Sequence, residues 1–114
     1  MNLQQIIDKL HLAVITTPKD FSQIMVKEGY SSDLLSCVMT GAPHGSLWIT
    51  LQAHINIVAV AALLDIAAVI ITEGAEPDEN TIKKANDEGI TLLSTSASSF
   101  ALCGMLWELG IRAN

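Results

Sequence analysis

Basic residues are scarce in this chain of 114 residues, which holds six lysines and arginines against twelve aspartates and glutamates. The formal net charge at pH 7 is −6, and the few cations form no stripe that could neutralise a phosphate backbone. The composition therefore argues against nucleic acid and against an anionic membrane surface as partners.

Cysteine is nearly absent, because only Cys37 and Cys103 occur, and they lack the short paired spacing of a zinc site. We expect two buried free thiols in a reducing cytosol and no metal site, even with His44 and His54 included. The N-terminus has no basic region ahead of an apolar one, so it does not have the pattern of a signal peptide. These features predict a cytoplasmic protein.

The chain has no apolar run long enough to cross a membrane. Residues 55–71 come closest, but Asp65 interrupts them and they fall short of the ~20 residues that a spanning helix needs. A buried helix followed by a buried strand explains this run better, and we expect no membrane association.

Familiar catalytic motifs are also missing: the chain has no GxxxxGK[ST], no GxGxxG and no GxSxG. The acidic pair Asp78 and Glu79 suits the first turn of a helix, and no cysteine has a histidine placed to activate it. We therefore expect no catalytic residues, no cofactor and no enzyme.

Half of the residues are hydrophobic, and their spacing predicts alternating helices and strands. Helices are expected at 3–10, 32–39, 55–64, 77–89 and 96–109. Strands are expected at 12–15, 47–50, 68–72 and 90–95. Residues 19–30 stay undecided: part of this segment is a possible edge strand, and Gly29 is expected in a turn. This alternation predicts an α/β fold in a single domain, residues 1–114, with a mostly parallel sheet of about four or five strands and helices on both faces.

Local signals refine three of the expected helices. Ser32 is the expected N-cap of the second helix, and Leu34, Leu35, Val38 and Met39 form its inner stripe. Pro77 is placed in the first turn of the fourth helix, which Gly89 ends. In the last helix, Phe100, Cys103, Leu106 and Trp107 are expected to point inward.

The helix expected at Ile55–Leu64 is apolar on all sides. Such a helix is buried all round, and a chain this small needs a partner subunit for that. The sequence therefore predicts a homo-oligomer, a dimer first, that associates through this helix.

Polar residues follow three successive strands, where open α/β sheets bind ligands. The candidate ligand-binding residues are Thr50, Gln52, His54, Asn56, Thr72, Gly74 and Thr95. Hydroxyls of Thr72 and Thr95 would donate hydrogen bonds, Gly74 would let the backbone approach, and His54 would supply charge. A small anionic metabolite or nucleotide is the expected ligand. His11, between helix and strand, is assigned no role.

Two segments carry a family resemblance: GSLWITLQAHINIVAVAAL and IITEGAEPDENTIKKANDEGITLLSTSASSFAL. They resemble the DRTGG domain and look similar to the N-terminal, non-catalytic domain of HPr kinase/phosphorylase. The D and R positions fall on Ala53 and His54, and the T-G-G positions fall on Thr72, Glu73 and Gly74, so only Thr72 and Gly74 match the motif.

The resemblance implies a small regulatory module and gives no support for kinase activity, since the P-loop domain of the kinase is not in this sequence. The single-domain relatives that share ITLQxHxNIVAVA look similar to proteins encoded near hydrogenase and redox operons. Two further roles stay open: a protein–protein adaptor without a ligand, and an enzyme with a site that no motif reveals.

Overall fold

The computed structural model describes residues 1–113, and its elements alternate along the chain. The helices are α1 (Leu3–Leu10), the short 3-10 helix η1 (Phe21–Gln23), α2 (Leu35–Gly41), α3 (Asn56–Leu63), α4 (Glu79–Glu88) and α5 (Ser99–Glu108). The strands are β1 (Ala13–Val14), β2 (Gly29–Ser31), β3 (Leu47–Thr50), β4 (Ala68–Ile71) and β5 (Leu92–Ser94). This order confirms the predicted α/β class.

The five strands form one sheet in the order β1-β5-β4-β3-β2. Strands β2, β3, β4 and β5 are parallel, and only β1 runs antiparallel, beside β5. A two-residue strand directly after a helix has no sequence signal for its direction, so the antiparallel edge could not be read from the alternation of helices and strands.

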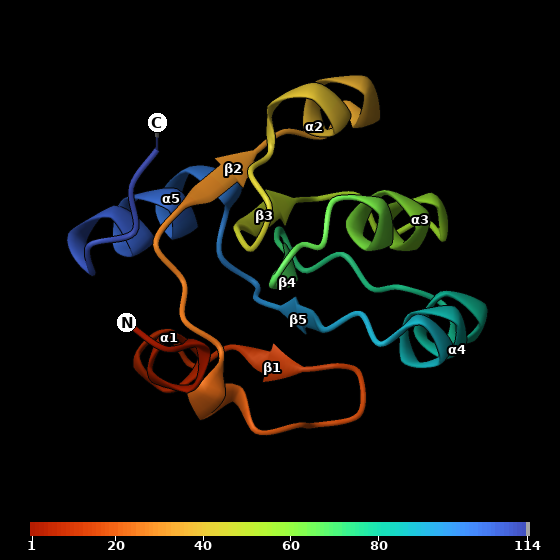
Figure 1. The fold of residues 1–114 in the computed structure, drawn as a ribbon, viewed down its shortest axis with the longest axis horizontal. Helices are drawn as coiled ribbons and strands as arrows, with labels where there is room; N and C mark the ends of the chain where they lie inside the picture. The colour runs from red at the N-terminus through yellow and green to blue at the C-terminus, as the bar shows by residue number, and fades with distance from the viewer. Residues whose placement is uncertain (114) are drawn as a thin grey trace.

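Helices cover both faces of the sheet, as Figure 1 shows. Helices α1 and α5 lie on one face, and α2, α3 and α4 lie on the other. The central strand β4 is buried along its whole length, because neighbours pair with both of its edges and helices cover both of its faces. Its sequence AVII is the continuous apolar run typical of an interior parallel strand.

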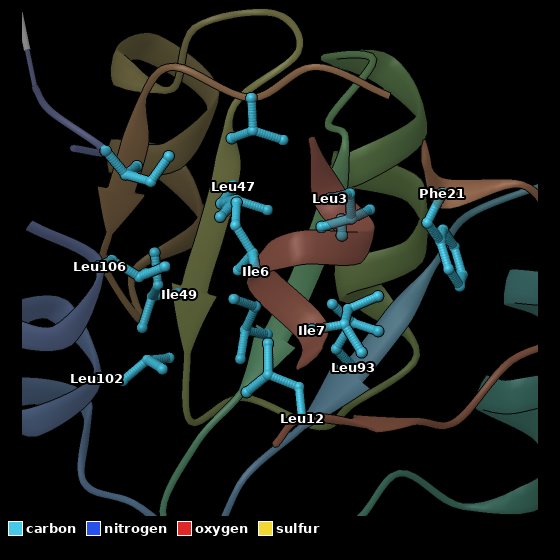
Figure 2. Packing of buried hydrophobic residues seen from close by; sticks show 14 residues of the cluster. Leu3, Ile6, Ile7, Leu12, Phe21, Leu47, Ile49, Leu93, Leu102 and Leu106 are labelled. Atoms are coloured by element: carbon cyan, nitrogen blue, oxygen red, sulfur yellow. The ribbon is translucent and has the colours of Figure 1, made fainter. Parts of the chain in front are cut away.

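Alternating side chains of the strands supply two separate apolar layers. In β3 and β4, Leu47, Ile49 and Ile70 join the layer under α1 and α5, while Trp48 and Val69 join the layer under α2, α3 and α4. Figure 2 shows the first layer, in which Leu3, Ile6 and Ile7 of α1 and Leu102 and Leu106 of α5 pack toward the strands.

The helix bounds predicted for α1 and α4 are close to those observed. Asn2 caps α1, and its side chain accepts a hydrogen bond from the Gln5 backbone N–H at 2.9 Å. Helix α4 begins at Glu79 instead of at Pro77, because the Asp78 side chain accepts the N–H of Thr81 and is itself the N-cap. Pro77 therefore precedes the helix.

The prediction for α2 was wrong at its start and on its inner face. The N-cap is Leu34, without a side-chain hydrogen bond, and the Ser32 hydroxyl instead closes a local turn by accepting the Leu34 N–H. Of the four expected inner residues only Val38 is buried, and Leu34 and Met39 are exposed. Asp33, which precedes the helix, accepts hydrogen bonds from Thr50 at the end of β3 and from the backbone N–H of Leu51.

In α5 the predicted inner face was partly wrong. Leu102 and Leu106 are the buried residues, whereas Phe100 is 92% exposed and Trp107 is 52% exposed. Because the helix is apolar around most of its surface, its sequence does not show which side faces the sheet.

The undecided segment 19–30 contains η1 and then β2, which is an edge strand as expected. Gly29 begins β2 and is not a turn residue. The two thiols are free, as predicted, but they are not buried: Cys37 is exposed and Cys103 is partly exposed.

Helix α3 buries only part of its apolar surface inside the chain. Ile57, Val58, Val60 and Ala61 are buried, while Leu63 is 64% exposed. The exposed part is still apolar, so the predicted interface with a partner subunit stays a prediction.

Candidate functional site

The parallel strands end at one edge of the sheet, and all seven predicted ligand residues lie along it. The register separates them, however. Thr50 pairs with Ile71, so Thr72 comes one position later and points to the opposite face of the sheet. The seven residues therefore form three groups, each held by different neighbours.

The first group is Thr50 with Gln52, organised by Asp33. The Asp33 carboxylate accepts the Thr50 hydroxyl at 2.8 Å and the Leu51 backbone N–H at 2.9 Å. The Gln52 side chain donates to the Asp33 carbonyl at 3.3 Å. Thr50 is fully buried, so this group ties α2 to the end of β3.

The second group is His54 with Asn56, at the start of α3. The His54 Nδ1 atom accepts the backbone N–H of Asn56 at 3.2 Å, which leaves Nε2 as the other hydrogen-bonding atom of the ring. His54 also lies near Asp78. Hydrogen bonds from the backbone and hydroxyl of Thr81 lower the pKa of Asp78, and the charge of His54 lowers it further.

The third group lies in the tight turn after β4. The Ala75 N–H donates to the Thr72 carbonyl at 3.2 Å, and Glu73 and Gly74 have φ angles of +63° and +71°. Two consecutive positive φ angles define a type I′ turn, which favours glycine or asparagine. The resemblance aligns Glu73 with the first glycine of T-G-G, and its φ angle is a physical reason for glycine at that position.

The side chain of Glu73 also contacts the first turn of α5. Its carboxylate accepts the backbone N–H of Ser99 at 2.8 Å, and the hydroxyls of Ser99 and Thr72 lie 2.6 Å apart. The positive end of this helix therefore holds a carboxylate from the chain itself. Thr72 is fully buried, so a ligand would reach its hydroxyl only after Ser99 moved.

A polar hollow of about 320 Å³ opens beside this turn, and we call it the Gly74 hollow. It collects two predicted residues, Gly74 and Thr95, with neighbours that the sequence did not assign to the site. Its lining is His11, Ala13, Gly74, Ala75, Glu76, Ser94, Thr95 and Ser96.

Hydroxyl groups give the Gly74 hollow most of its hydrogen-bonding capacity. The Thr95 Oγ1 atom accepts the Ala97 N–H at 3.2 Å, which leaves the hydroxyl proton free to be donated. Ser94 and Ser96 flank it, and His11 adds an imidazole from the end of α1. His11 was missed because it lies between two elements and reaches the hollow only through the pairing of β1 with β5.

Within residues 1–113 no three His, Cys, Asp or Glu side chains lie close enough together to hold a metal ion. No helix in the same part of the chain has the length and apolar character needed to cross a membrane. The arrangement thus offers hydrogen-bond donors and acceptors at the sheet edge, a chemistry suited to binding.

Comparison with solved structures shows the same fold in the regulatory region of a pyrophosphatase. The similar structure is the crystal structure of the CBS and DRTGG domains of the regulatory region of Clostridium perfringens pyrophosphatase, complexed with its activator diadenosine tetraphosphate. The TM-score is 0.74 at 18% sequence identity, over 92% of this chain and 45% of that chain. This chain therefore spans less than half the length of the pyrophosphatase region.

The sequence comparisons give one assignment. A search of curated proteins finds no match, whereas the profile of the DRTGG domain matches residues 36–109. That match covers β3, α3, β4, α4, β5 and the three groups of predicted ligand residues. The chain belongs to the DRTGG domain family.

Proposed function

We propose that this chain is a cytoplasmic, non-catalytic regulatory module, a single domain that binds a small phosphorylated ligand, a nucleotide first, at the carboxyl edge of the sheet. The observation that carries the proposal is the Gly74 hollow, with Thr95 and its hydroxyl neighbours beside a glycine turn. Open α/β sheets bind ligands at this edge. Hydroxyl groups and nearby backbone N–H groups can donate hydrogen bonds to phosphate oxygens.

The mixed lining of the hollow favours a nucleotide over a simple anion. Hydroxyls of Thr95 and Ser96 would donate to phosphate oxygens, and His11 would add charge when protonated. Glu76 would repel a bare phosphate, but its carboxylate would accept a hydrogen bond from a ribose hydroxyl or a base amine. A ligand that has both a phosphate and a ribose or base would form hydrogen bonds with the hydroxyls and with the Glu76 carboxylate.

The family supports a regulatory role. In the Clostridium perfringens pyrophosphatase, the DRTGG domain belongs to a regulatory region whose activator is diadenosine tetraphosphate. That region contains CBS domains as well, so nucleotide binding by the DRTGG fold itself is part of the present proposal.

The other predicted residues would have outer or supporting roles. His54 and Asn56, near Asp78, would contact a ligand that extends along the edge toward α3. Thr50 and Gln52 would hold that part of the edge through Asp33, and Thr72 would hold the turn through Ser99.

A thermal-shift screen tests the proposal, with diadenosine tetraphosphate, ATP, AMP and inorganic pyrophosphate as the probes. A ligand at a hundred times its dissociation constant stabilises the native state by about 2.7 kcal/mol, which raises the melting temperature by several degrees. We expect a nucleotide to give this rise in the wild type and a clearly smaller one in Ser96→Ala and His11→Asn. His44→Asn, in an exposed loop outside the hollow, is the matched control. No rise with any probe would overturn the proposal.

A second role, docking of a protein partner, is supported by the exposed apolar side of α3. Leu63 and Ile55 are exposed there, and Ala59 and Ala62 between them would allow close approach. In that role the chain would be an adaptor, for a redox or hydrogenase system or for a second copy of itself. A pull-down lost in Leu63→Ser, with no nucleotide response, would favour it.

A further inference from the structure

The outer side of α5 carries the most exposed large hydrophobic side chain of residues 1–113. Phe100 is 92% exposed, and Trp107, seven residues later, is also turned toward solvent. Seven residues are two helical turns, so the two aromatic rings lie on one side of α5 about 10 Å apart along its axis. Gly104 lies between them, and a methyl group added there would meet no atom within 4 Å.

An apolar hollow lies between α5 and β2, with Trp107 in its lining, and we call it the Trp107 hollow. Its volume is about 200 Å³, and its walls are the last turns of α5, the strand β2 and the C-terminal segment that pairs beside β2. Cys103, Leu106, Trp107, Ile49 and Ile111 supply the apolar lining. An apolar cavity of about 150 Å³ is large enough for a benzene ring, so the Trp107 hollow has room for a phenylalanine side chain.

The far wall of the Trp107 hollow is held in place by the C-terminal segment. The backbone of Arg112 forms a parallel β-bridge with that of Glu28. The Arg112 guanidinium lies 4.6 Å from the centre of the Trp107 ring. The Arg112 side chain also donates to the Trp107 carbonyl. These contacts fix Trp107 as one rigid side of the hollow.

Antiparallel packing of two α5 helices would bring the exposed ring to the hollow. With a two-fold axis between Cys103 and Gly104, Phe100 of one copy lies at the level of the partner's Trp107, at the mouth of the partner's Trp107 hollow. The same operation places the partner's Phe100 at the first copy's hollow, as an isologous interface requires. Gly104 on the axis lets the helices come close.

Charge and area also favour a second copy as the occupant. Each chain has a net charge of −6, yet the α5 segment carries a single charged residue, Glu108, followed by Arg112. Two acidic molecules can therefore meet on this side without bringing carboxylate clusters together. The exposed side chains of α5 offer on the order of 500 Å² per copy, or about 1,000 Å² for the pair, which is the size of a weak, reversible interface.

We propose that the outer side of α5 is a homodimer interface in which Phe100 of each copy inserts into the partner's Trp107 hollow. This interface lies on the face of the sheet opposite α3, so it leaves the exposed side of α3 free for another partner. It uses none of the residues that line the Gly74 hollow.

Sedimentation velocity over a concentration series, up to about 0.1 mM, tests the interface. We expect a dimer for the wild type and a monomer for Phe100→Ser, whose dissociation constant should rise roughly 100-fold or more because each dimer loses two inserted rings. Gly104→Leu should also give a monomer, since a β-carbon at this position meets no neighbour in the single copy and the leucine side chain would block the axis. Leu63→Ser, which changes the exposed side of α3, is the matched control and should stay dimeric.

Iodide quenching of tryptophan fluorescence gives an independent readout. Trp48 is fully buried, so quenching reports on Trp107, and it should fall as the wild type dimerises but not in Phe100→Ser. Circular dichroism confirms that each variant is folded. A wild type that is monomeric throughout, or a dimer that survives Phe100→Ser and Gly104→Leu but not Leu63→Ser, would overturn the proposal.

Discussion

At the scale of single residues, Glu73 combines a costly backbone conformation with a useful contact. Its φ of +63° costs an ordinary side chain roughly 1 kcal/mol or more, while its carboxylate caps the first turn of α5 through the Ser99 N–H. We predict that Glu73→Ala lowers the free energy of unfolding by about 1 kcal/mol, because the cap is lost and the strain stays.

Glu73→Gly separates the two effects, since glycine also loses the cap but adopts positive φ freely. The glycine variant should be about 1 kcal/mol more stable than the alanine variant in urea unfolding. Equal stability of the two variants would show that the turn after β4 carries no strain.

Asp78 makes stability depend on pH at the start of α4. Hydrogen bonds from Thr81, together with the charge of His54, lower its pKa below the usual value of 3.8. A lowered pKa in the folded state means that the charged form stabilises the fold above pH 3.8, and that this contribution is lost as the pH falls through the folded value.

We therefore predict that Asp78→Asn, which keeps a capping side chain but removes the charge, is less stable than the wild type at pH 7. The difference should shrink as the pH falls below 3.8. Urea unfolding of both proteins across this range measures it, with Glu79→Gln as the control for a charge in the same turn. A difference that does not change with pH would contradict the assignment.

At the scale of elements, α2 is fixed against β2 by a contact that glycine alone permits. A β-carbon at Gly41 would lie 2.6 Å from the Tyr30 hydroxyl oxygen and 2.7 Å from its ring. The Tyr30 hydroxyl donates to the Cys37 carbonyl at 3.1 Å, so the ring is held in place. We predict that Gly41→Ala costs about 1–2 kcal/mol, although alanine favours a helix more than glycine does.

A double-mutant cycle checks that this cost comes from the Tyr30 ring. In a Tyr30→Ala background, Gly41→Ala should be neutral or slightly stabilising when measured by thermal unfolding. The same loss in both backgrounds would mean that Gly41 is required for another reason.

The elements that could be predicted from the sequence are those with a strong local pattern. The runs at β3 and β4 and the end of α4 at Gly89 follow from such patterns. The inner side of α5 could not be predicted in this way, because the residues of the helix are apolar nearly all round. The start of α2 could not be predicted either, because Asp33 hydrogen-bonds to Thr50, a residue distant in sequence.

At the scale of the whole molecule, the sheet decides which predicted ligand residues meet. The sequence predicted that all of them lie at the same end of the sheet, since each follows a parallel strand. It did not show that Thr50 and Thr72 point to opposite faces, which depends on the register of β3 against β4. Nor did it show that His11 joins Gly74, which depends on the antiparallel pairing of β1 with β5.

We propose that this DRTGG domain itself binds a nucleotide at the Gly74 hollow. The most direct test is a titration of the isotope-labelled chain with diadenosine tetraphosphate, followed through its amide resonances by NMR. We expect saturable shifts concentrated at Gly74, Ala75 and Ser94–Ser96 and weak shifts at the distant α2 residue Thr40. Resonances that stay unchanged at millimolar nucleotide, or that shift only along α3 or α5, would contradict it.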